Sequence, residues 1–420
     1  MDSLFSFTFS YPLLMAYMWI IGALFYYYHR ERVDHRVPSD PPELPDYPGV
    51  SFLIPCHNES ESVIDTIESV IVQQYPVFEI IAINDASDDD TGQILDELAT
   101  RHDRLRVIHF NINQGKAMGL RMAAMASRYE YLICLDGDAI LDPYASKWIM
   151  RHFVNGPRVG AVTGNPRVRN RTTLLGKIQV GEFSSIIGLI KRAQRIYGRI
   201  FTVSGVVAAF RKEALQKVGF WNLNTVTEDI DISWRLQLGH WDIRYEPNAL
   251  CWILMPEKLL GLWRQRLRWA QGGIEALMLH GKALRHWHSR RMWLVMAELV
   301  VSSFWAYAML ASFSLWGLGQ FVDLPPALQA PGIIPGWTGV LLGFTCLVQF
   351  GVSLAIDSRY EPRLSRYYYW MVWYPLLYWV LQALATCVAV PKALSSGLKT
   401  RGTWTSPDRG ISASKAPGKS

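Results

Sequence analysis

The segment Tyr131-Leu132-Ile133-Cys134-Leu135-Asp136-Gly137-Asp138 is an apolar run that ends abruptly in two carboxylates. Apolar runs of this length are typical of buried strands. Apolar residues between two further runs recur at helical spacing from Val63 to Ile71, which predicts a crossover helix. The other predicted strands are Val50–Ile54, Phe78–Ile83, Leu105–Phe110 and Gly160–Thr163. Because such runs alternate with amphipathic stretches, the sequence predicts an α/β domain with a parallel sheet covered by helices.

Long uncharged segments flank this α/β pattern, and they predict membrane helices. Hydrophobic residues make up 50% of the 420 residues and charged residues only 19%, with 17 Trp, a balance typical of a chain that partly faces lipid. The predicted division is an N-terminal membrane helix with a basic flank (1–36), a Pro-rich linker (37–48), the α/β domain with interface helices (49–290), a membrane region of about three spans (291–391) and a polar tail (392–420).

Basic flanks predict the orientation of these helices. Ser3 to Tyr28 carries no charge and is followed by His29, Arg30 and Arg32, which places the C-terminal end of the first helix in the cytoplasm. The later spans are expected at Leu294–Gly319, Pro335–Ile356 and Tyr367–Val390.

The loops between the later spans agree with this orientation, but the tail does not. Asp357 to Arg366 is basic and favours the cytoplasm, whereas the Pro-rich loop from Pro325 to Pro335 favours the outside. Counting spans then sends the tail outside, although Lys392 and Arg401 favour the cytoplasm. Two alternatives stay open: the last span is broken at Pro375 and does not fully cross, or the charge rule fails here.

Two amphipathic segments, Leu174–Arg199 and Lys258–Leu279, lie between the α/β pattern and the membrane region. They read either as interfacial helices on the bilayer or as ordinary domain helices with solvated basic faces. In the second segment, Trp263 and Trp269 among arginines favour the interface.

The formal charge of +6 and pI near 9.0 do not indicate nucleic acid, because the basic residues lie beside apolar runs, where anionic lipid headgroups are the simpler partner. The five cysteines are far apart and show neither metal-ligand nor redox spacing, so we expect reduced thiols used as small apolar residues.

Polar or special residues follow each predicted strand. They are Pro55 and Glu59, Asp85, Lys116, and the pair Asp136 and Asp138. Ligands of open α/β sheets bind outside the carboxyl ends of the strands, so we expect these residues to converge on a crevice that fits a nucleotide.

The Asp136-Gly137-Asp138 triplet suits a divalent cation. In an extended segment the two carboxylates point to the same side, and the glycine leaves room for a ligand. Mg²⁺ prefers a few carboxylates plus diphosphate oxygens, and it would neutralise charge on a departing UDP. Taken alone, the triplet is also common in turns.

Asp85 and Lys116 each have a functional and an ordinary interpretation. The Asp85 carboxylate is placed to accept hydrogen bonds from a uracil or ribose, or to cap a helix in a turn. Lys116 is placed to balance diphosphate charge, or is a surface lysine.

Thr227-Glu228-Asp229 precedes an amphipathic helical segment, Ile230 to Leu238. One of these acids could cap that helix. The sharper hypothesis is that Asp229 is a general base, which accepts the proton of an acceptor hydroxyl as that oxygen attacks an anomeric carbon from the face opposite UDP. That geometry inverts an α-linked donor to a β-linked product.

Gln265-Arg266-Leu267-Arg268-Trp269 is the most specific motif. Arg268 suits a diphosphate in forked geometry, Gln265 suits the diphosphate or the acceptor, and Trp269 offers a flat apolar face to a sugar ring. The ordinary interpretation is a basic interfacial helix with an anchoring tryptophan.

Together, Asp85, Asp136-Gly137-Asp138, Thr227-Glu228-Asp229 and Gln265 to Trp269 resemble the D, DxD, TED and QxxRW series of family 2 processive glycosyltransferases, in the same order. The resemblance covers Val50 to Gly272 and, with the membrane helices, nearly the whole chain. It implies a cytoplasmic GT-A (Rossmann-like) domain on a transmembrane α-helical bundle, and a product that leaves through the bundle.

The resemblance also implies residue roles. UDP-sugar contacts would be Pro55, Glu59, Asp85, Lys116, Asp136 and Asp138, with Asp138 also the ligand of Mg²⁺ or Mn²⁺. Asp229 would be the base. The clamp for acceptor and diphosphate would be Ser204, Gly205, Glu228, Gln265, Arg268 and Trp269.

Within that family the chain is most similar to bacterial poly-N-acetylglucosamine synthases of the PgaC type, on Ile54–Glu59 and on Ser406–Gly410. This likeness implies polymerisation of N-acetylglucosamine from UDP-GlcNAc into a β-1,6-linked polymer, with export across the bacterial inner membrane. It further implies a small membrane partner of PgaD type and control by cyclic di-GMP. Relatives of this type often have an additional N-terminal span, which the sequence does not predict here.

Three alternatives remain at this point. Synthases of cellulose, chitin or hyaluronan share the motifs. A single-step transferase onto polyprenyl phosphate would share the sheet and the aspartates but would not need the Gln265 to Trp269 motif. A protein that only binds a nucleotide-sugar would need no base at Asp229, since fold alone does not establish activity.

Overall fold

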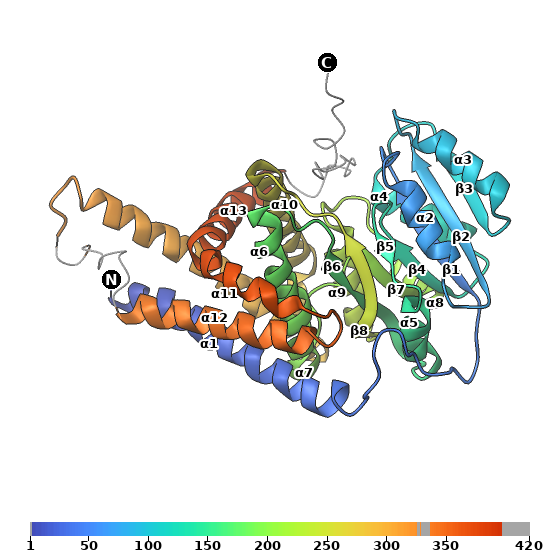
Figure 1. Cartoon of the computed structure of the whole chain (residues 1–420). Helices are drawn as coiled ribbons and strands as arrows, with labels where there is room; N and C mark the ends of the chain where they lie inside the picture. The colour runs from blue at the N-terminus through green and yellow to red at the C-terminus, as the bar shows by residue number, and fades with distance from the viewer. Residues whose placement is uncertain (1, 326–327, 329–336, 397–420) are drawn as a thin grey trace, which may run out of the picture. The chain divides into compact units, whose positions relative to one another are not determined.

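The computed structural model describes residues 2–325, 328 and 337–396, which group into two compact units (Figure 1). The sheet unit comprises His35–Gln179 and Arg199–Leu262, and the helical unit comprises residues 2–34, Val180–Gly198 and Trp263–Ser396. Residues 397–420 of the predicted polar tail, with the Ser406–Gly410 segment, and most of the Pro325–Pro335 loop lie outside the described residues, whereas residues 392–396 belong to the last helix.

The sheet unit is built on eight strands in the order β3-β2-β1-β4-β7-β6-β8-β5. Their bounds are β1 Val50–Cys56, β2 Phe78–Asp85, β3 Leu105–Phe110, β4 Tyr131–Leu135, β5 Ile140–Leu141, β6 Val159–Val168, β7 Val207–Arg211 and β8 Asp242–Ile253. All five predicted strands are therefore confirmed. Strands β1, β2, β3 and β4 pair in parallel, so their carboxyl ends share one edge.

The expectation of a parallel sheet is wrong for β7 and β5, whereas β6 and β8 also pair in parallel. Strand β7 runs antiparallel to both β4 and β6, and β5 runs antiparallel to β8. The reason is local: Ser204 and Val207 pair across a tight turn, which reverses the chain directly into β7. The sheet is mixed, and the turn at Ser204 lies beside the end of β4.

Helices cover the sheet (Figure 1). One core cluster joins apolar side chains of β1 and β2, such as Leu53 and Ile83, to Leu120 of α4 and to Leu215 and Leu236 of the following helices. The helices of this unit are α2 Val63–Ile71, α3 Thr91–Arg101, α4 Lys116–Ala126, α5 Ala145–Val154, α8 Lys212–Val218 and α9 Glu228–Leu238. The predicted crossover helix is α2.

Two helices continue from the sheet unit into the helical unit, and they correspond to the predicted amphipathic segments. They are α6 Leu174–Phe183, which leads into the π-helical stretch η2 Ser184–Ile190 and then α7 Lys191–Tyr197, and α10 Leu259–His280. Lys191 and Arg192 are buried, so these two basic side chains do not form the solvated face that one alternative assumed.

Within the described part of the chain, four helices are long and apolar enough to cross a membrane: Leu4–Glu31, Trp287–Leu318, Thr338–Asp357 and Leu377–Ser395. They fall on the four predicted spans. As elements of the helical unit they are α1 Asp2–Tyr26 with η1 Tyr27–Glu31, α11 Arg290–Leu318, α12 Trp337–Asp357 and α13 Tyr374–Ser396. Short 3-10 helices η3 Gly281–Arg285 and η4 Trp287–Ser289 precede α11.

The predicted start of the last span, at Tyr367, is wrong. A 3-10 helix, η6 Leu364–Trp373, occupies that position, and α13 begins at Tyr374, directly before Pro375. Proline is tolerated in the first turn of a helix, where its missing N–H has no partner to lose. The change of helix type therefore lies at the break that one alternative placed at Pro375.

Small residues allow α1 and α7 to lie close together. A Cβ at Gly22 would lie 2.6 Å from the Tyr197 ring and 2.8 Å from the Ala193 Cβ, so a larger residue at position 22 would clash. Trp19 and Ala23 of α1 pack on Ala193 in the same cluster. Close contact of helices through small residues is typical of membrane proteins.

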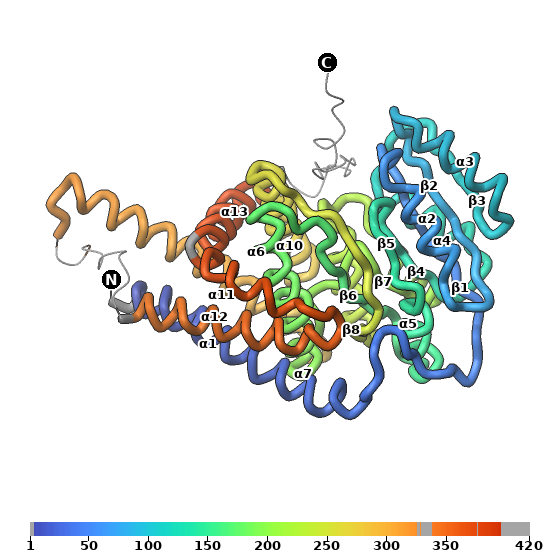
Figure 2. Tube along the Cα trace, viewed as in Figure 1, coloured from blue at the N-terminus to red at the C-terminus, as the bar shows by residue number. Residues whose placement is uncertain are grey.

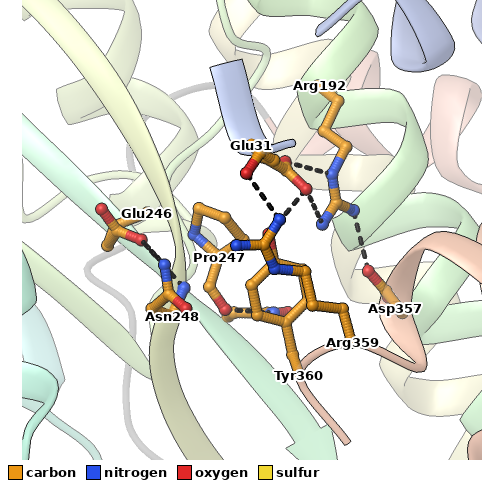
Figure 3. Close-up of polar contacts among 9 residues, drawn as sticks. Glu31, Arg192, Glu246, Pro247, Asn248, Asp357, Arg359 and Tyr360 are labelled. Atoms are coloured by element: carbon orange, nitrogen blue, oxygen red, sulfur yellow. Dashed lines mark hydrogen bonds and ion pairs between the residues drawn. The ribbon is translucent and has the colours of Figure 1, made fainter. Parts of the chain in front are cut away.

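A buried charge cluster joins three elements of the helical unit (Figure 3). The Arg192 guanidinium is fully buried and donates from Nε to Glu31 Oε1 at 2.6 Å and from Nη1 to Asp357 Oδ1 at 2.8 Å. The Tyr360 hydroxyl donates to Glu31 Oε2 at 2.6 Å, and Arg359 donates to the Glu31 carbonyl at 2.5 Å. The cluster thus ties the ends of α1 and α12 to α7.

The cluster has a consequence for topology. Because Glu31 and Asp357 both bond to Arg192, the C-terminal ends of α1 and α12 meet. Figure 2 shows the two helices side by side. If both span the membrane, these two ends emerge on the same side. That arrangement agrees with the cytoplasmic position that basic residues predict for both.

We predict that Arg192→Met destabilises the protein by about 3–5 kcal/mol, because it leaves two buried carboxylates without their cation. The measurement is the unfolding free energy or midpoint of the detergent-solubilised protein. Arg285→Met, at an exposed arginine of the same unit, is the matched control and should change stability by less than about 0.5 kcal/mol. Equal behaviour of the two variants would contradict the structural role of the cluster.

Candidate active site

Asp85 ends β2 and holds the loop before α4. Its carboxylate is fully buried and accepts from the Gln114 N–H at 2.6 Å and from the Gly115 N–H at 2.8 Å. Gly115 has φ of +84°, a conformation that favours glycine. Asp85 therefore sets the entry of α4 and with it the position of Lys116. Its contact with a nucleotide stays a prediction.

The Lys116 ammonium contacts hydrogen-bond acceptors from three segments. Its Nζ lies 2.5 Å from Asp136 Oδ1 and 3.2 Å from Glu228 Oε1, and it donates to the Gly205 carbonyl at 3.0 Å. Burial alone would lower the pKa of Lys116, but the Asp136 and Glu228 carboxylates raise it well above its ordinary value, with a smaller contribution from Asp229. The ammonium is therefore charged and brings together the ends of β4, α9 and the turn before β7.

Asp229 lies in the first turn of α9, next to Gly205. A Cβ at Gly205 would lie 3.1 Å from Asp229 Oδ2 and 3.5 Å from Lys116 Nζ, so the absence of a side chain at 205 leaves space beside this carboxylate. Asp229 Oδ1 accepts from the Ile230 N–H at 2.9 Å. The turn itself is held because the Ser204 N–H donates to Thr163 Oγ1 at 2.8 Å.

The Asp136-Gly137-Asp138 triplet follows β4 and packs tightly on β1. A Cβ at Gly137 would lie 3.1 Å from the Glu59 Cγ and 3.3 Å from the Pro55 carbonyl oxygen, so glycine is the residue that fits. The Thr66 hydroxyl donates to the Gly137 carbonyl at 3.0 Å. Pro55 and Glu59 thus lie beside the triplet, as the shared strand edge predicts.

Glu59 itself is buried and bonded. Its N–H donates to Thr91 Oγ1 at 2.8 Å, and its Oε2 accepts from the Ser62 hydroxyl at 3.0 Å. Pro55 packs against α4, where a Cβ at Gly119 would lie 3.3 Å from the Pro55 Cβ. These contacts make both residues part of the frame around the triplet.

A metal site has few protein ligands here. Among the described residues, no group of three or more His, Cys, Asp or Glu side chains is placed to hold a metal ion. Mg²⁺ usually takes only one or two carboxylates and completes its shell with phosphate oxygens and water. Asp138, with Asp136 engaged by Lys116, fits that donor set when a diphosphate is present.

The charges of this cluster are unequal. Asp136, Glu228 and Asp229 contribute three carboxylates near Lys116, which contributes one ammonium, and this leaves a formal charge of −2 among these four residues. A diphosphate entering beside them would be repelled unless a cation came with it. The cluster therefore favours a nucleotide that arrives with a divalent metal.

The Gln265–Trp269 motif lies on α10, in the helical unit. Positions 265, 268 and 269 are spaced i, i+3 and i+4, so the three side chains share one face of the helix. Arg268 is exposed, and Gln265 and Trp269 are half-buried. The face can reach a ligand, but the meeting of this motif with Asp229 stays a prediction.

Several residues that support the site were not singled out from the sequence. Thr66 holds the Gly137 carbonyl, Thr163 holds the Ser204 N–H, and Arg266 is buried behind the clamp motif. Isolated threonines carry no pattern, so only the contacts reveal the first two. The sequence did offer a pointer to Arg266, since this residue lies inside the most specific motif. All five cysteines are buried, which agrees with their use as small apolar residues.

Comparison with known proteins agrees with the motifs. The model of a family described as "Glycosyltransferase like family 2" matches residues 48–272. A poly-β-1,6-N-acetyl-D-glucosamine synthase of Staphylococcus epidermidis is 40% identical over 407 residues, which cover 97% of this chain and 98% of the relative. A synthase of the same name from Staphylococcus aureus (strain COL) is 38% identical over the same shares of the two chains.

A solved structure shares the fold. The mannosyltransferase PcManGT from Pyrobaculum calidifontis, in complex with GDP-Man and Mn²⁺, superposes with a TM-score of 0.61 at 19% identity, covering 94% of this chain and 98% of that one. The predicted GT-A fold with candidate membrane helices is thereby confirmed. The chain belongs to glycosyltransferase family 2 and is a sugar-transferring enzyme.

Proposed function

We propose that this enzyme polymerises N-acetylglucosamine from UDP-GlcNAc into a β-1,6-linked polymer and exports it across the bacterial inner membrane. The observation that carries the proposal is the cluster of Lys116 with Asp136, Glu228 and Gly205, beside Asp229. The relatives named as synthases of this polymer, which align with nearly the whole chain, support the choice of sugar and linkage.

Asp229 is the proposed base. As the acceptor hydroxyl oxygen bonds to the anomeric carbon, the bond from that carbon to the UDP oxygen breaks, and the hydroxyl proton passes to the Asp229 carboxylate. Attack from the face opposite UDP inverts the anomeric configuration. A carboxylate is a weak base for an alcohol, so the proton moves as the oxygen attacks.

Asp138 is the proposed ligand of Mg²⁺ or Mn²⁺. When bound, the cation would neutralise negative charge that develops on the departing diphosphate. The formal charge of −2 of Lys116 with Asp136, Glu228 and Asp229 supports this need. Lys116, also a proposed contact of the UDP-sugar, keeps Glu228 and Asp136 in place through its ion pairs with them.

Gln265, Arg268 and Trp269 are the proposed clamp for diphosphate and acceptor, because they share one helix face and Arg268 is exposed. Asp85 and Pro55 would position the nucleotide end of the donor. A small membrane partner of PgaD type, control by cyclic di-GMP and contact with membrane lipids belong to the same proposal.

The direct test supplies the purified enzyme with UDP-GlcNAc, UDP-glucose and UDP-glucuronate in turn and sizes the product. Long polymer from UDP-GlcNAc alone, cleaved by a β-1,6-specific hydrolase, is the expected result. Polymer from another donor would indicate a cellulose or hyaluronan type of synthase. One sugar transferred to lipid would indicate the single-step transferase instead.

We predict that Asp229→Asn lowers kcat by about 10²–10⁴-fold, because the variant loses the general base. The donor KM or UDP affinity should change little, since the amide keeps the size of the carboxylate. Initial rates of UDP release measure both. Asp103→Asn, at an exposed loop aspartate, is the control and should behave as wild type. Retained turnover in Asp229→Asn would exclude this residue as the base.

We predict that removal of divalent cations with EDTA abolishes polymer formation and that Mg²⁺ or Mn²⁺ restores it. In Asp138→Asn the metal concentration for half-maximal activity should rise about tenfold or more, which corresponds to about 1.4 kcal/mol of lost binding. A metal titration of the initial rate gives this value. Full activity in EDTA, or an unchanged metal requirement in the variant, would contradict the assignment.

We predict that Lys116→Met lowers stability by the same amount at every pH between about 7 and 9.5, because the pKa of Lys116 is raised above the ordinary lysine value of about 10.4. A raised pKa adds stability that is fully present below the ordinary value and is lost as the pH rises through the raised one. Unfolding midpoints of wild type and variant test this.

The control for Lys116→Met is Lys217→Met, which removes an exposed ion pair with Glu213 worth about 0–1 kcal/mol. A stability difference for Lys116→Met that disappears by pH 9 would mean that Lys116 loses its proton below the ordinary lysine pKa, which would contradict a raised pKa.

A further inference from the structure

Arg266 lies inside the clamp motif but points away from the face that carries Gln265, Arg268 and Trp269. Arg268 is exposed, whereas Arg266 is 2% exposed. One residue along a helix turns the side chain by about 100°, which takes position 266 off the shared face. Arg266 therefore has a partner inside the helical unit rather than a ligand in solvent.

That partner is Glu182 of α6. Arg266 Nη2 donates to Glu182 Oε2 at 2.6 Å, and each side chain is 3% exposed. The other carboxylate oxygen of Glu182 accepts from the Tyr374 hydroxyl at 3.4 Å. Glu182 is thus held from two sides, and it anchors one end of the Arg266 guanidinium through a buried ion pair.

The same guanidinium lies over the ring of Trp269. Its Cζ is 4.5 Å from the Trp269 ring centroid and 5.9 Å from that of Tyr378. Positions 266 and 269 are i and i+3 on α10, so the contact follows from helix geometry. A planar guanidinium can stack on an aromatic face, whereas an ammonium offers the charge without the planar contact. Glu182 thus fixes Arg266, and Arg266 covers one face of the indole.

The backbone around Glu182 is held as well. A Cβ at the neighbouring Gly181 would lie 2.0 Å from the sulfur of Met371, so the α6 backbone lies directly on this buried side chain of η6. Tyr374 follows three residues after Met371. Contacts at both residues therefore keep α6 against the segment that joins η6 to α13.

We propose that Arg266, oriented by Glu182, is a positioning residue that fixes the Trp269 indole for stacking against the acceptor sugar, and so sets acceptor affinity and product length. The inference rests on the proposed role of Trp269 in the acceptor clamp. An aromatic platform that is already fixed loses little conformational entropy when a sugar binds. Loss of the guanidinium should therefore weaken acceptor binding without affecting donor binding.

The test variant is Arg266→Lys, which keeps the charge beside Glu182 and removes the planar group over the indole. With a poly-N-acetylglucosamine oligosaccharide as acceptor, we expect the acceptor KM to rise about three-fold or more, because the ammonium keeps the charge but lacks the planar face against the indole. The donor KM and the kcat at saturating acceptor should change less than about two-fold, and the polymer should be shorter. Arg264→Lys, at an exposed arginine of the same helix, should match wild type.

A double-mutant cycle separates positioning from general destabilisation. Trp269→Ala should raise the acceptor KM at least as much as Arg266→Lys, and the combined variant should show no further rise, because both act through one indole. Additive effects, or a fall in kcat for every substrate alike, would overturn the proposal.

A second variant covers the case in which Arg266→Lys does not fold. Glu182→Gln with Arg266→Gln leaves a neutral pair that can still hydrogen-bond, and it should give the same acceptor-specific defect. A wild-type acceptor KM in this double variant would overturn the proposal. An unchanged acceptor KM in Trp269→Ala would contradict the clamp itself, whereas a defect in Trp269→Ala with a normal Arg266→Lys would contradict the positioning role alone.

Discussion

The candidate active site depends on one partly buried ammonium. Lys116 contacts Asp136 at the end of β4, Glu228 at the start of α9 and the Gly205 carbonyl in the turn before β7. Without a cation these carboxylates would repel one another, and they would need hydration or protonation instead. Lys116 and Asp136 are mostly shielded from solvent. Salt therefore screens the attraction between their charges less than it screens the attraction within a surface ion pair. The sheet brings the ends of its strands to one edge, and Lys116 fixes the positions of the side chains that meet there.

In the helical unit, too, a cationic side chain neutralises carboxylates from other segments. Arg192 balances Glu31 and Asp357, and Arg266 balances Glu182, so each buried arginine joins helices that are distant in sequence. Replacing such pairs by apolar residues is often neutral for stability, which makes specificity of arrangement the better account of their role. In both units, ion pairs therefore add to apolar packing in fixing the positions of helices.

The strands and membrane helices could be predicted because apolar runs and their lengths report burial directly, as for β3 at Leu105–Phe110. The antiparallel β7 could not, because Val207–Arg211 is short and its direction depends on the turn at Ser204. The residues of the candidate site were found through strand ends and motif order, yet the engagement of Lys116 by three acceptors has no sequence signature. Pairings such as Arg192 with Glu31 join residues 161 positions apart, and a single sequence does not indicate them.

We propose that carboxylates of the sheet unit and the motif on α10 act on one metal-bound diphosphate. An experimental structure of the enzyme with UDP and Mn²⁺ tests this most directly. The account predicts Mn²⁺ held by Asp138 and both phosphates, Asp229 facing the open side of the sugar site, and Arg268 and Trp269 within contact of the same nucleotide and acceptor. Mn²⁺ bound away from Asp138, or UDP bound with the α10 motif out of reach, would contradict it.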